Sequence, residues 1–332
     1  MEEKKQNQIV NDDVKTVTAQ DVVAAHKRND REKCFELALQ ISDDPVAACY
    51  IGYYYQFGYV VGKDLAEAFK WYRRSAAKGY VAAQTNLAYL YRKGLGVKRD
   101  NYSAVYWYQR AADQGSLKAK ANLGYMYECG FGVKQDYKKA FLLYTEALNG
   151  GVNEVEFALG ELYGKGRGVE QNPEEAFRLV KSAAEKGHGE AQNRTALMYE
   201  RGEGTQQDFA EAVKWYQKSA ENGFPAAYSN LGMLYMVGKG VEKNPEYGAQ
   251  LLRVAADKGY VEAKFRLANA YRVGVGVEKD IQESKRLYVE SASKGHKKAR
   301  EHLARMKAEG YFDEKKMTEL EILKNKIKKI FK

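Results

Sequence analysis

Apolar positions along the chain fall into a pattern that repeats every 36 residues, and each period holds two stretches with the spacing of an α-helix. In one period the first stretch runs from about Val81 to Lys93, with Ala83, Leu87 and Leu90 on one side. The second stretch begins after Asp100, and its apolar positions are Ala104, Trp107, Tyr108 and the Ala111-Ala112 pair. The pattern predicts two amphipathic helices in each period.

Glycine marks the ends of both predicted helices. One ladder at 36-residue steps follows the first helix: Gly58, Gly94, Gly130, Gly166, Gly202, Gly238, Gly274 and Gly310. A second ladder follows the second helix: Gly79, Gly115, Gly151, Gly187, Gly223, Gly259 and Gly295. A glycine at a helix end takes the left-handed conformation without a Cβ penalty. We therefore expect each helix to stop at its glycine.

The start of the second helix has its own signature. Asp100 is a good N-cap residue, and Asn172-Pro173 puts a cap and a proline at the first helical position in another period. A glutamate stands three residues after several of these caps, in Asp64/Glu67, Asn172/Glu175, Asp208/Glu211 and Asp280/Glu283. This spacing predicts capping boxes, in which the glutamate side chain accepts from the cap backbone.

A helix pair of this size cannot bury its own apolar face, so it must stack on its neighbours. Small residues at recurring positions, such as Ala83 and Gly124, allow close helix approach. Two tyrosine ladders, which pass through Tyr91 and Tyr108, are expected to fill the core. The sequence predicts an all-α fold, a right-handed superhelical α-solenoid of 36-residue helix-turn-helix repeats.

The domain organisation follows from where this pattern begins and ends. Residues 1–16 are polar and charged and are expected to form a disordered arm. Residues 17–43 read as two N-terminal capping helices, and residues 44–312 as seven repeats plus a half repeat, the fourth repeat being the most divergent. In residues 313–332, apolar residues from Met317 to Ile330 at helical spacing predict a basic amphipathic capping helix.

The repeat resembles a known family. The pattern A-x-x-x-L-A/G-x-x-Y-x-x-G-x-G-V-x-x-D-x-x-x-A-x-x-W-Y-x-x-A-A-x-x-G, as in Ala83 to Gly115, is similar to the Sel-1-like repeat, a relative of the tetratricopeptide repeat with a glycine-rich loop. The resemblance covers residues 44 to about 312. Departures from the pattern are Thr195, Thr205, Val180 and Leu252. The resemblance implies a scaffold or adaptor whose first helices line the concave side.

One stripe of the first helix points away from its core side, because positions i, i+4, i+7 and i+11 share a helix face. This stripe is aromatic and rich in asparagine in the early repeats, and arginine is added later. Asparagine can bond both an N–H and a C=O of an extended peptide, and tyrosine offers a rigid contact face. The predicted partner-binding residues are Tyr50, Tyr53, Asn86, Tyr89, Asn122, Tyr125, Arg194, Asn230 and Arg266. The alternative is that they are tolerated solvent positions.

Candidate chemistry is sparse elsewhere. His26, His188, His296 and His302 are scattered, and we interpret His188 and His296 as half-buried packing residues rather than metal ligands. The recurring GxG loops lack the preceding strand of a phosphate-binding motif. We therefore predict no enzyme activity, no metal and no small-molecule cofactor. Because the first residues lack an apolar signal segment and the three cysteines are unpaired within repeats, a cytoplasmic location is expected.

The net charge of +10 leaves one alternative site. Residues 314–332 hold seven lysines and three glutamates, a net charge of +4, while the remaining charge is mixed over the surface. Membrane or nucleic-acid partners are therefore not favoured, although the tail at residues 322–332 could dock to either. A second alternative is the β-lactam binding and hydrolysis of a secreted cysteine-rich branch of the family, whose paired cysteines this chain lacks. The leading hypothesis is a non-catalytic scaffold that holds a protein or an extended peptide in its concave groove.

Overall fold

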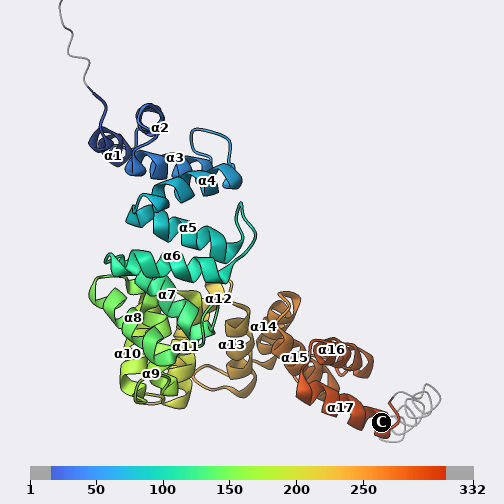
Figure 1. Ribbon diagram of the computed structural model, residues 1–332. Helices are drawn as coiled ribbons and strands as arrows, with labels where there is room; N and C mark the ends of the chain where they lie inside the picture. The colour runs from blue at the N-terminus through green and yellow to red at the C-terminus, as the bar shows by residue number, and fades with distance from the viewer. Residues whose placement is uncertain (1–15, 312–332) are drawn as a thin grey trace, which may run out of the picture. The chain divides into compact units, whose positions relative to one another are not determined.

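The structure, a computed structural model, describes residues 16–311, and within them all regular secondary structure is helical (Figure 1). This part of the chain forms α1 (Ala19–Lys27), α2 (Arg31–Gln40), α3 (Pro45–Phe57), α4 (Leu65–Ala77), α5 (Val81–Lys93), α6 (Asn101–Asp113), α7 (Leu117–Cys129), α8 (Tyr137–Asn149), η1 (Asn153–Val155), α9 (Glu156–Lys165), α10 (Pro173–Glu185), α11 (Gly189–Arg201), α12 (Phe209–Glu221), α13 (Pro225–Val237), α14 (Pro245–Asp257), α15 (Val261–Val273), α16 (Ile281–Ser293) and α17 (Lys297–Ala308). The all-α prediction, with its helix-turn-helix period of about 36 residues, is confirmed.

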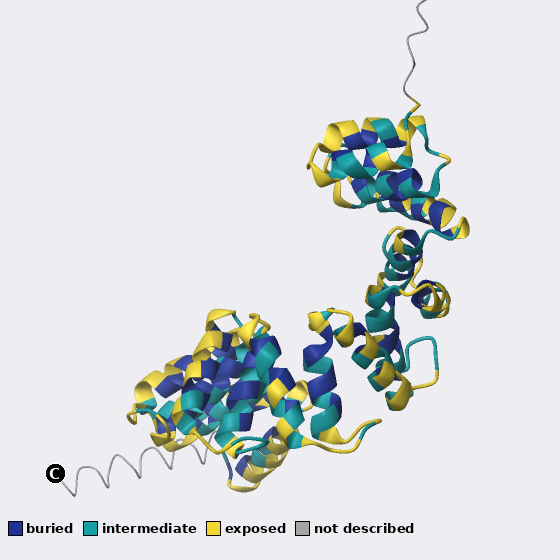
Figure 2. Cartoon of the chain, turned by 90° about the vertical axis from the view of Figure 1, so that its left-hand side faces the viewer, coloured by how far each residue is buried: buried dark blue, intermediate teal, exposed yellow. Residues whose placement is uncertain are grey.

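From α3 onward the helices alternate between two roles. The first helices of the seven repeats are α3, α5, α7, α9, α11, α13 and α15, and the second helices are α4, α6, α8, α10, α12, α14 and α16. Each helix packs mainly on the helices next to it in sequence. Figure 2 shows the consequence, a buried strip along each helix opposite an exposed one. The core is therefore a row of local clusters rather than one centre.

The helix ends follow the glycine prediction. Gly58, Gly94, Gly130, Gly202, Gly238 and Gly274 close first helices in the left-handed conformation, with φ between 70° and 79°. Two residues beyond five of them, all except Gly58, a second loop glycine touches the preceding repeat. A Cβ on Gly96 would lie 1.9 Å from the carbonyl oxygen of Leu65, at the start of α4. The loop of each such repeat thus lies directly on the second helix of the repeat before it.

The N-cap predictions are confirmed, but the capping-box prediction is wrong in its second half. Asp64 accepts hydrogen bonds from the backbone N–H groups of Ala66 and Glu67, at 2.9 and 3.0 Å. The Glu67 carboxylate, however, pairs with Lys70 on the next turn, 2.5 Å away. Glu175, Glu211 and Glu283 do the same with Arg178, Lys214 and Arg286. A charged lysine or arginine side chain three residues further on binds the carboxylate more strongly than the single backbone N–H of the N-cap residue does.

His188 and His296 have a role that the sequence reasoning missed. Each is an N-cap whose ring Nδ1 accepts a backbone N–H, from Ala191 and Ala299 respectively, at 3.1 Å. His296 is half-buried as expected, but His188 is exposed. Both rings still pack between repeats, against Phe157 and Phe265.

The two tyrosine ladders differ in depth. The second-helix tyrosines are buried, as predicted: Tyr72, Tyr108, Tyr144, Tyr216 and Tyr288. The first-helix ladder through Tyr91 is only half-buried, so the core prediction overstated it. Tyr91 meets the edge of Phe69, on the second helix of the preceding repeat, with ring centroids 5.2 Å apart. These rings join repeats at the margin of the core.

The fourth repeat is where the chain divides into two compact units. Within the described residues, unit 1 comprises residues 16–155 with 167–169, and unit 2 comprises residues 156–166 with 170–311. The first helix of this repeat is interrupted, with η1 followed by an α9 of 10 residues where the other first helices have 13. The predicted arm at residues 1–16 lies almost wholly outside the described residues, as does the predicted capping helix at residues 313–332.

Candidate functional site: the outer stripe of the first helices

The predicted stripe lies at the surface of the first helices of unit 1. We call the side of α3, α5 and α7 that faces away from the core of each helix pair the first-helix surface of unit 1. Tyr50 and Tyr53 on α3 are half-buried, Tyr89 on α5 is half-buried, and Tyr125 on α7 is 38% exposed. Tyr53, Tyr89 and Tyr125 occupy the same position in consecutive repeats, 36 residues apart. The surface therefore carries one tyrosine per repeat at a fixed register.

Four aromatic or cationic groups gather at the C-terminal end of α3. Tyr53 and Phe57 lie with ring centroids 4.7 Å apart, and Phe57 stacks on Tyr59 at 5.6 Å with nearly parallel rings. Phe57 and Tyr59 are 46% and 45% exposed. The guanidinium carbon of Arg31, on α2, lies 4.2 Å from the centre of the Tyr59 ring. This cluster is open apolar surface with a positive charge at its edge.

Arg92 connects the next two tyrosines of the stripe. Its guanidinium carbon lies 5.5 Å from the centre of the Tyr89 ring and 5.4 Å from that of Tyr125, so it bridges α5 and α7. Tyr125 in turn meets Phe131 of the following loop, with centroids 5.9 Å apart. The aromatic stripe is continuous from α5 into the third repeat, and cation–π contacts hold its rings in place.

The asparagines of unit 1 are less free than the sequence suggested. The amide of Asn122 donates to the Lys118 carbonyl of its own helix, at 2.8 Å. Asn86 lies beside the buried thiol of Cys49; burial raises the pKa of that thiol to about 12, and the hydrogen bond to Asn86 partly opposes the shift. Asn122 is thus bonded within α7, whereas Asn86 contributes to packing between α3 and α5.

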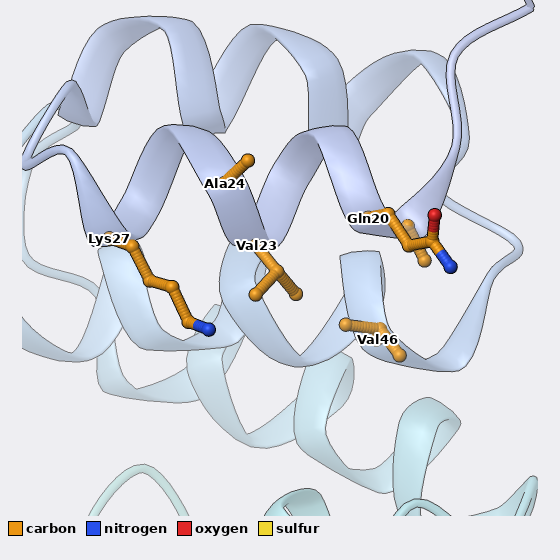
Figure 3. A pocket seen from close by; sticks show the side chains of 6 residues that line it. Gln20, Val23, Ala24, Lys27 and Val46 are labelled. Carbon is orange, nitrogen blue, oxygen red and sulfur yellow. The ribbon is translucent and has the colours of Figure 1, made fainter.

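A shallow apolar hollow of about 390 Å³ lies between α1 and the first turn of α3 (Figure 3). Val23 of α1 and Val46 of α3 point into it, and Gln20 and Lys27 stand at its sides. Val46 is the first position of the stripe on α3. The hollow therefore extends the first-helix surface of unit 1 onto α1.

Unit 2 carries the same stripe in a different chemical form. Arg194 is paired with Glu161 at 3.0 Å and with Glu203 at 2.9 Å. Asn230 donates to Asn193 at 3.2 Å and accepts from Arg266 at 3.0 Å, and Arg266 also pairs with Glu262 at 3.1 Å. The predicted residues Arg194, Asn230 and Arg266 thus lie at the surface but are already bonded within the protein.

Comparison with known proteins identifies the repeat. The family model of the Sel1 repeat matches seven times, at residues 45–80, 81–116, 117–152, 154–188, 189–224, 225–260 and 261–296. The chain belongs to the Sel1 repeat family. Repeat solenoids of this kind typically mediate protein–protein interactions and are generally not catalytic. Among curated proteins, none matches the chain significantly.

Solved structures of Sel1 repeat proteins agree with the fold. A protective antigen of uropathogenic Escherichia coli with an SLR fold aligns with a TM-score of 0.68 and 28% identity, over 87% of this chain and 67% of that one. A Sel1 repeat protein from Oxalobacter formigenes aligns with a TM-score of 0.64 and 34% identity, over 71% of this chain and 96% of that one. Both likenesses place the chain among Sel1 repeat solenoids.

The part of the Sel1 array that the structure describes lacks the features of two other kinds of site. Residues 16–311 contain no group of three or more histidine, cysteine or acidic side chains placed to hold a metal ion. None of the helices in this part is long and apolar enough to cross a membrane. The basic tail at residues 322–332 lies outside the described residues.

Three residues of the first-helix surface were missed from the sequence. Arg31, Tyr59 and Arg92 stand outside the i, i+4, i+7, i+11 stripe, so helical periodicity did not select them. Arg31 belongs to α2 and Tyr59 to a loop. A signal was nevertheless present, because Arg92 and Tyr59 are close in sequence to the stripe tyrosines that they contact.

Proposed function

We propose that this Sel1 repeat protein is a non-catalytic scaffold that holds an extended segment of a partner protein on the first-helix surface of unit 1. The observation that carries the proposal is the tyrosine ladder of Tyr53, Tyr89 and Tyr125, one residue per repeat, at or near the surface. A ladder at a fixed register matches a peptide that runs across successive repeats. In helix-pair solenoids the first helices line the inner side, so this surface would form a concave groove.

The chemistry of the ladder suits a peptide with apolar side chains. Tyrosine gives a large rigid contact area at small entropic cost, and it keeps a hydroxyl for a hydrogen bond to a peptide backbone. Arg92 fixes Tyr89 and Tyr125 from one side, at 5.5 and 5.4 Å. Less side-chain freedom then remains to be lost when a partner binds.

The bonded state of unit 2 favours unit 1 as the main contact. A partner that bonded Arg194 or Arg266 would first have to displace Glu161 or Glu262. Exchange of one charge-assisted hydrogen bond for another yields little net binding energy. No ion pair has to be broken before a partner covers exposed aromatic rings such as Phe57 and Tyr59, and covering them removes apolar surface from water.

The two other functions considered from the sequence have no comparable support. All three cysteines, Cys34, Cys49 and Cys129, are free, unlike those of the cysteine-rich branch. The docking function of the basic tail would depend on residues outside the described part of the chain. The scaffold function depends instead on side chains of α3, α5 and α7, whose contacts the structure defines.

Site-specific photo-cross-linking tests this proposal. p-Benzoylphenylalanine is placed at Tyr89 or, as a matched control, at Met233, which has the same register in unit 2. Cells that express each variant are irradiated, and cross-linked proteins are identified by mass spectrometry. The proposal predicts one reproducible partner, cross-linked through a single short segment, at position 89 and much less at position 233. Equal yields at the two positions, or cross-links spread over many proteins, would contradict it.

A further inference from the structure

The second helices of unit 1 carry exposed apolar side chains that the first-helix surface does not include. Tyr102 and Tyr106 lie one turn apart on α6 and are 78% and 52% exposed. Leu142 of α8, which is 52% exposed, is the residue equivalent to Tyr106 one repeat later. We call these three residues the second-helix patch.

The other repeats show what this position normally holds. The residue equivalent to Tyr106 is Lys70, Arg178, Lys214 or Arg286 in four of the seven repeats, and each pairs with a glutamate three residues earlier. The N–O distances of these pairs are 2.5 to 2.6 Å, and the basic side chains are 57–64% exposed. The fold therefore directs this position into solvent and places a surface ion pair there.

In α6 and α8 both members of that pair are replaced together. Glutamate gives way to Ser103 and Lys139, and the basic residue gives way to Tyr106 and Leu142. In the sixth repeat the pair is also absent, but there the residue equivalent to Tyr106 is the polar Gln250. Among the seven second helices, α6 and α8 are thus the two that place exposed apolar groups at this position, and they belong to consecutive repeats.

The two repeats that carry the second-helix patch have a net positive charge, and Arg110, Lys138 and Lys139 are the basic residues on α6 and α8 themselves. Residues 81–152, which form repeats two and three, contain ten Lys and Arg and five Asp and Glu, a net charge of +5 out of +10 for the whole chain. Residues 154–224, the next two repeats, contain nine basic and thirteen acidic residues, a net charge of −4. Half of the net charge thus lies in the two repeats that carry the patch.

The five acids of residues 81–152 are all engaged within the protein. Asp100 caps α6 and Asp136 caps α8. Glu128 accepts a hydrogen bond from Tyr144, and Asp113 accepts one from Gln109. Glu146 forms an ion pair with Lys120.

Among the exposed basic residues, Arg110 lies over Tyr106 and donates to its hydroxyl at 3.0 Å. Lys138 directly precedes Lys139 on α8. Lys139 Nζ lies 5.2 Å from the centre of the Tyr127 ring. Arg110 and Lys139 thus contact aromatic rings of the protein and retain a positive charge that an acidic ligand can meet.

We infer that the second-helix patch is a separate docking site for an amphipathic helix of another protein, with aliphatic residues on one face and aspartate or glutamate beside them. Tyr102, Tyr106 and Leu142 would cover the aliphatic face, and Arg110, Lys138 and Lys139 would meet the acids. Aromatic and arginine residues beside each other are typical of interface hot spots. The complementary charge sets the orientation and rate of association.

A second copy of the chain fits this patch less well. The acidic repeats of the chain, at residues 154–224, already pair several of their carboxylates with their own lysines and arginines, as Glu175 and Glu211 do. A nucleic acid would satisfy the positive charge but makes no use of Leu142, which offers neither a stacking plane nor a hydrogen bond. An acidic amphipathic helix uses every member of the site.

The internal repeats supply the variant that tests the inference. Ser103→Glu with Tyr106→Lys in α6, and Lys139→Glu with Leu142→Lys in α8, install the ion pair that α4, α10, α12 and α16 already carry. Because the array accommodates this pair at four equivalent positions, the fourfold variant is expected to fold. Circular dichroism and thermal unfolding check that it does.

The probes are two displayed libraries of 16-residue amphipathic helical peptides with the same leucine face, flanked by Asp and Glu in one library and by Lys in the other. The intact chain should enrich only the acidic library, and its selected peptides should bind the fourfold variant at least ten-fold more weakly by fluorescence anisotropy. A Tyr53→Ala/Tyr89→Ala variant should bind them unchanged, which separates this site from the proposed groove.

Four results would overturn the inference. The first is that the intact chain enriches neither library, and the second is that the selected peptides bind the intact chain and the fourfold variant with equal affinity. A third is that the intact chain prefers a single-stranded 20-mer oligonucleotide and the fourfold variant no longer binds it. The fourth is that the intact chain sediments as a dimer and the fourfold variant as a monomer, because that would assign the patch to a second copy.

Discussion

At the scale of single residues, the buried tyrosines of the second helices show how each repeat satisfies a polar group in its core. The hydroxyls of Tyr72, Tyr144 and Tyr216 donate to Gln56, Glu128 and Glu200, each 16 residues earlier on the first helix, at 2.7 to 2.8 Å. In the fourth and sixth repeats the tyrosine is replaced by Val180 and Leu252. The residue 16 positions earlier is then Gly164 or Met236, so the polar partner disappears with the hydroxyl.

Removal of one hydroxyl should therefore cost stability only where the hydroxyl is bonded. Tyr144→Phe removes a hydrogen bond to a carboxylate and is expected to lower the free energy of unfolding by about 1–3 kcal/mol. The matched change is Tyr108→Phe, because the Tyr108 hydroxyl is buried without a hydrogen-bond partner in the described structure. Tyr108→Phe is expected to be neutral within about 0.5 kcal/mol, or stabilising. Urea unfolding of both variants decides, and equal losses would contradict the assignment.

The same tyrosines predict how stability depends on pH. Burial raises the pKa of Tyr108 to about 12, from an ordinary value near 10, and burial likewise raises the pKa of Tyr72 and Tyr216. Below pH 10 these tyrosine hydroxyls are protonated in both the folded and the unfolded chain, so their contribution to the free energy of unfolding is constant. Above pH 10 the unfolded chain releases protons that the folded chain keeps, so stability falls as pH rises.

Urea unfolding from pH 8 to pH 11.5 measures this dependence. The free energy of unfolding should be level up to about pH 10 and then decline. Tyr216→Phe should make the decline shallower, whereas Tyr102→Phe, at a 78% exposed position, should leave it unchanged. A decline of the same slope in Tyr216→Phe would show that the buried tyrosines are not its source.

At the scale of the structural element, the second loop glycine, two residues beyond the glycine that closes the first helix, sets the contact with the preceding repeat in repeats two to seven. Gly96 has φ of 67°, and a Cβ there would lie 1.9 Å from the Leu65 carbonyl oxygen. Gly79 has φ of 90° but has nothing within 4 Å of such a Cβ. A comparison of substitutions at Gly96 and Gly79 therefore distinguishes the cost of backbone strain from the cost of a steric clash between repeats.

Gly96→Ala should accordingly destabilise the array much more than Gly79→Ala. Both substitutions carry the left-handed strain of about 1 kcal/mol, and only Gly96→Ala adds an overpacking cost of about 1–3 kcal/mol. Thermal and urea unfolding of the two variants measure the difference. If the two losses are equal, the loop does not rest on the preceding repeat as described.

Much of this element-level structure was predictable from the sequence, because the ladders through Gly94, Gly115 and Tyr91 fix period, helix ends and register at once. The absence of the full capping boxes was not predictable, because the N-cap N–H and the Lys70 ammonium group compete for the Glu67 carboxylate. The spacing of these residues does not show which of the two it binds. The contacts of Arg194 with Glu161 and of Arg266 with Asn230 were equally hidden, because these partners come from neighbouring repeats. The pair of Arg266 with Glu262, four residues earlier on the same helix, could have been read from the spacing. Sequence periodicity located the stripe but could not show which of its groups were already occupied.

At the scale of the whole molecule, helices contact mainly their sequence neighbours, so stability should be local. Gly96→Ala should speed amide hydrogen exchange in α4 to α7 and leave α13 to α16 close to wild type. Hydrogen exchange followed by mass spectrometry gives this comparison peptide by peptide. A uniform loss of protection over residues 16–311 would instead indicate one cooperative unit.

The affinity of the partner captured at Tyr89 tests whether the tyrosine ladder of unit 1 holds a partner protein. The purified partner is titrated against the intact chain, against Tyr53→Ala/Tyr89→Ala/Tyr125→Ala, and against Leu197→Ala/Met233→Ala, which alters the same register in unit 2. Isothermal titration calorimetry should show a loss of about 100-fold or more for the tyrosine variant and less than about three-fold for the control, since hot-spot aromatics contribute about 2 kcal/mol or more each. Unchanged affinity in a folded tyrosine variant would show that the ladder does not bind the partner.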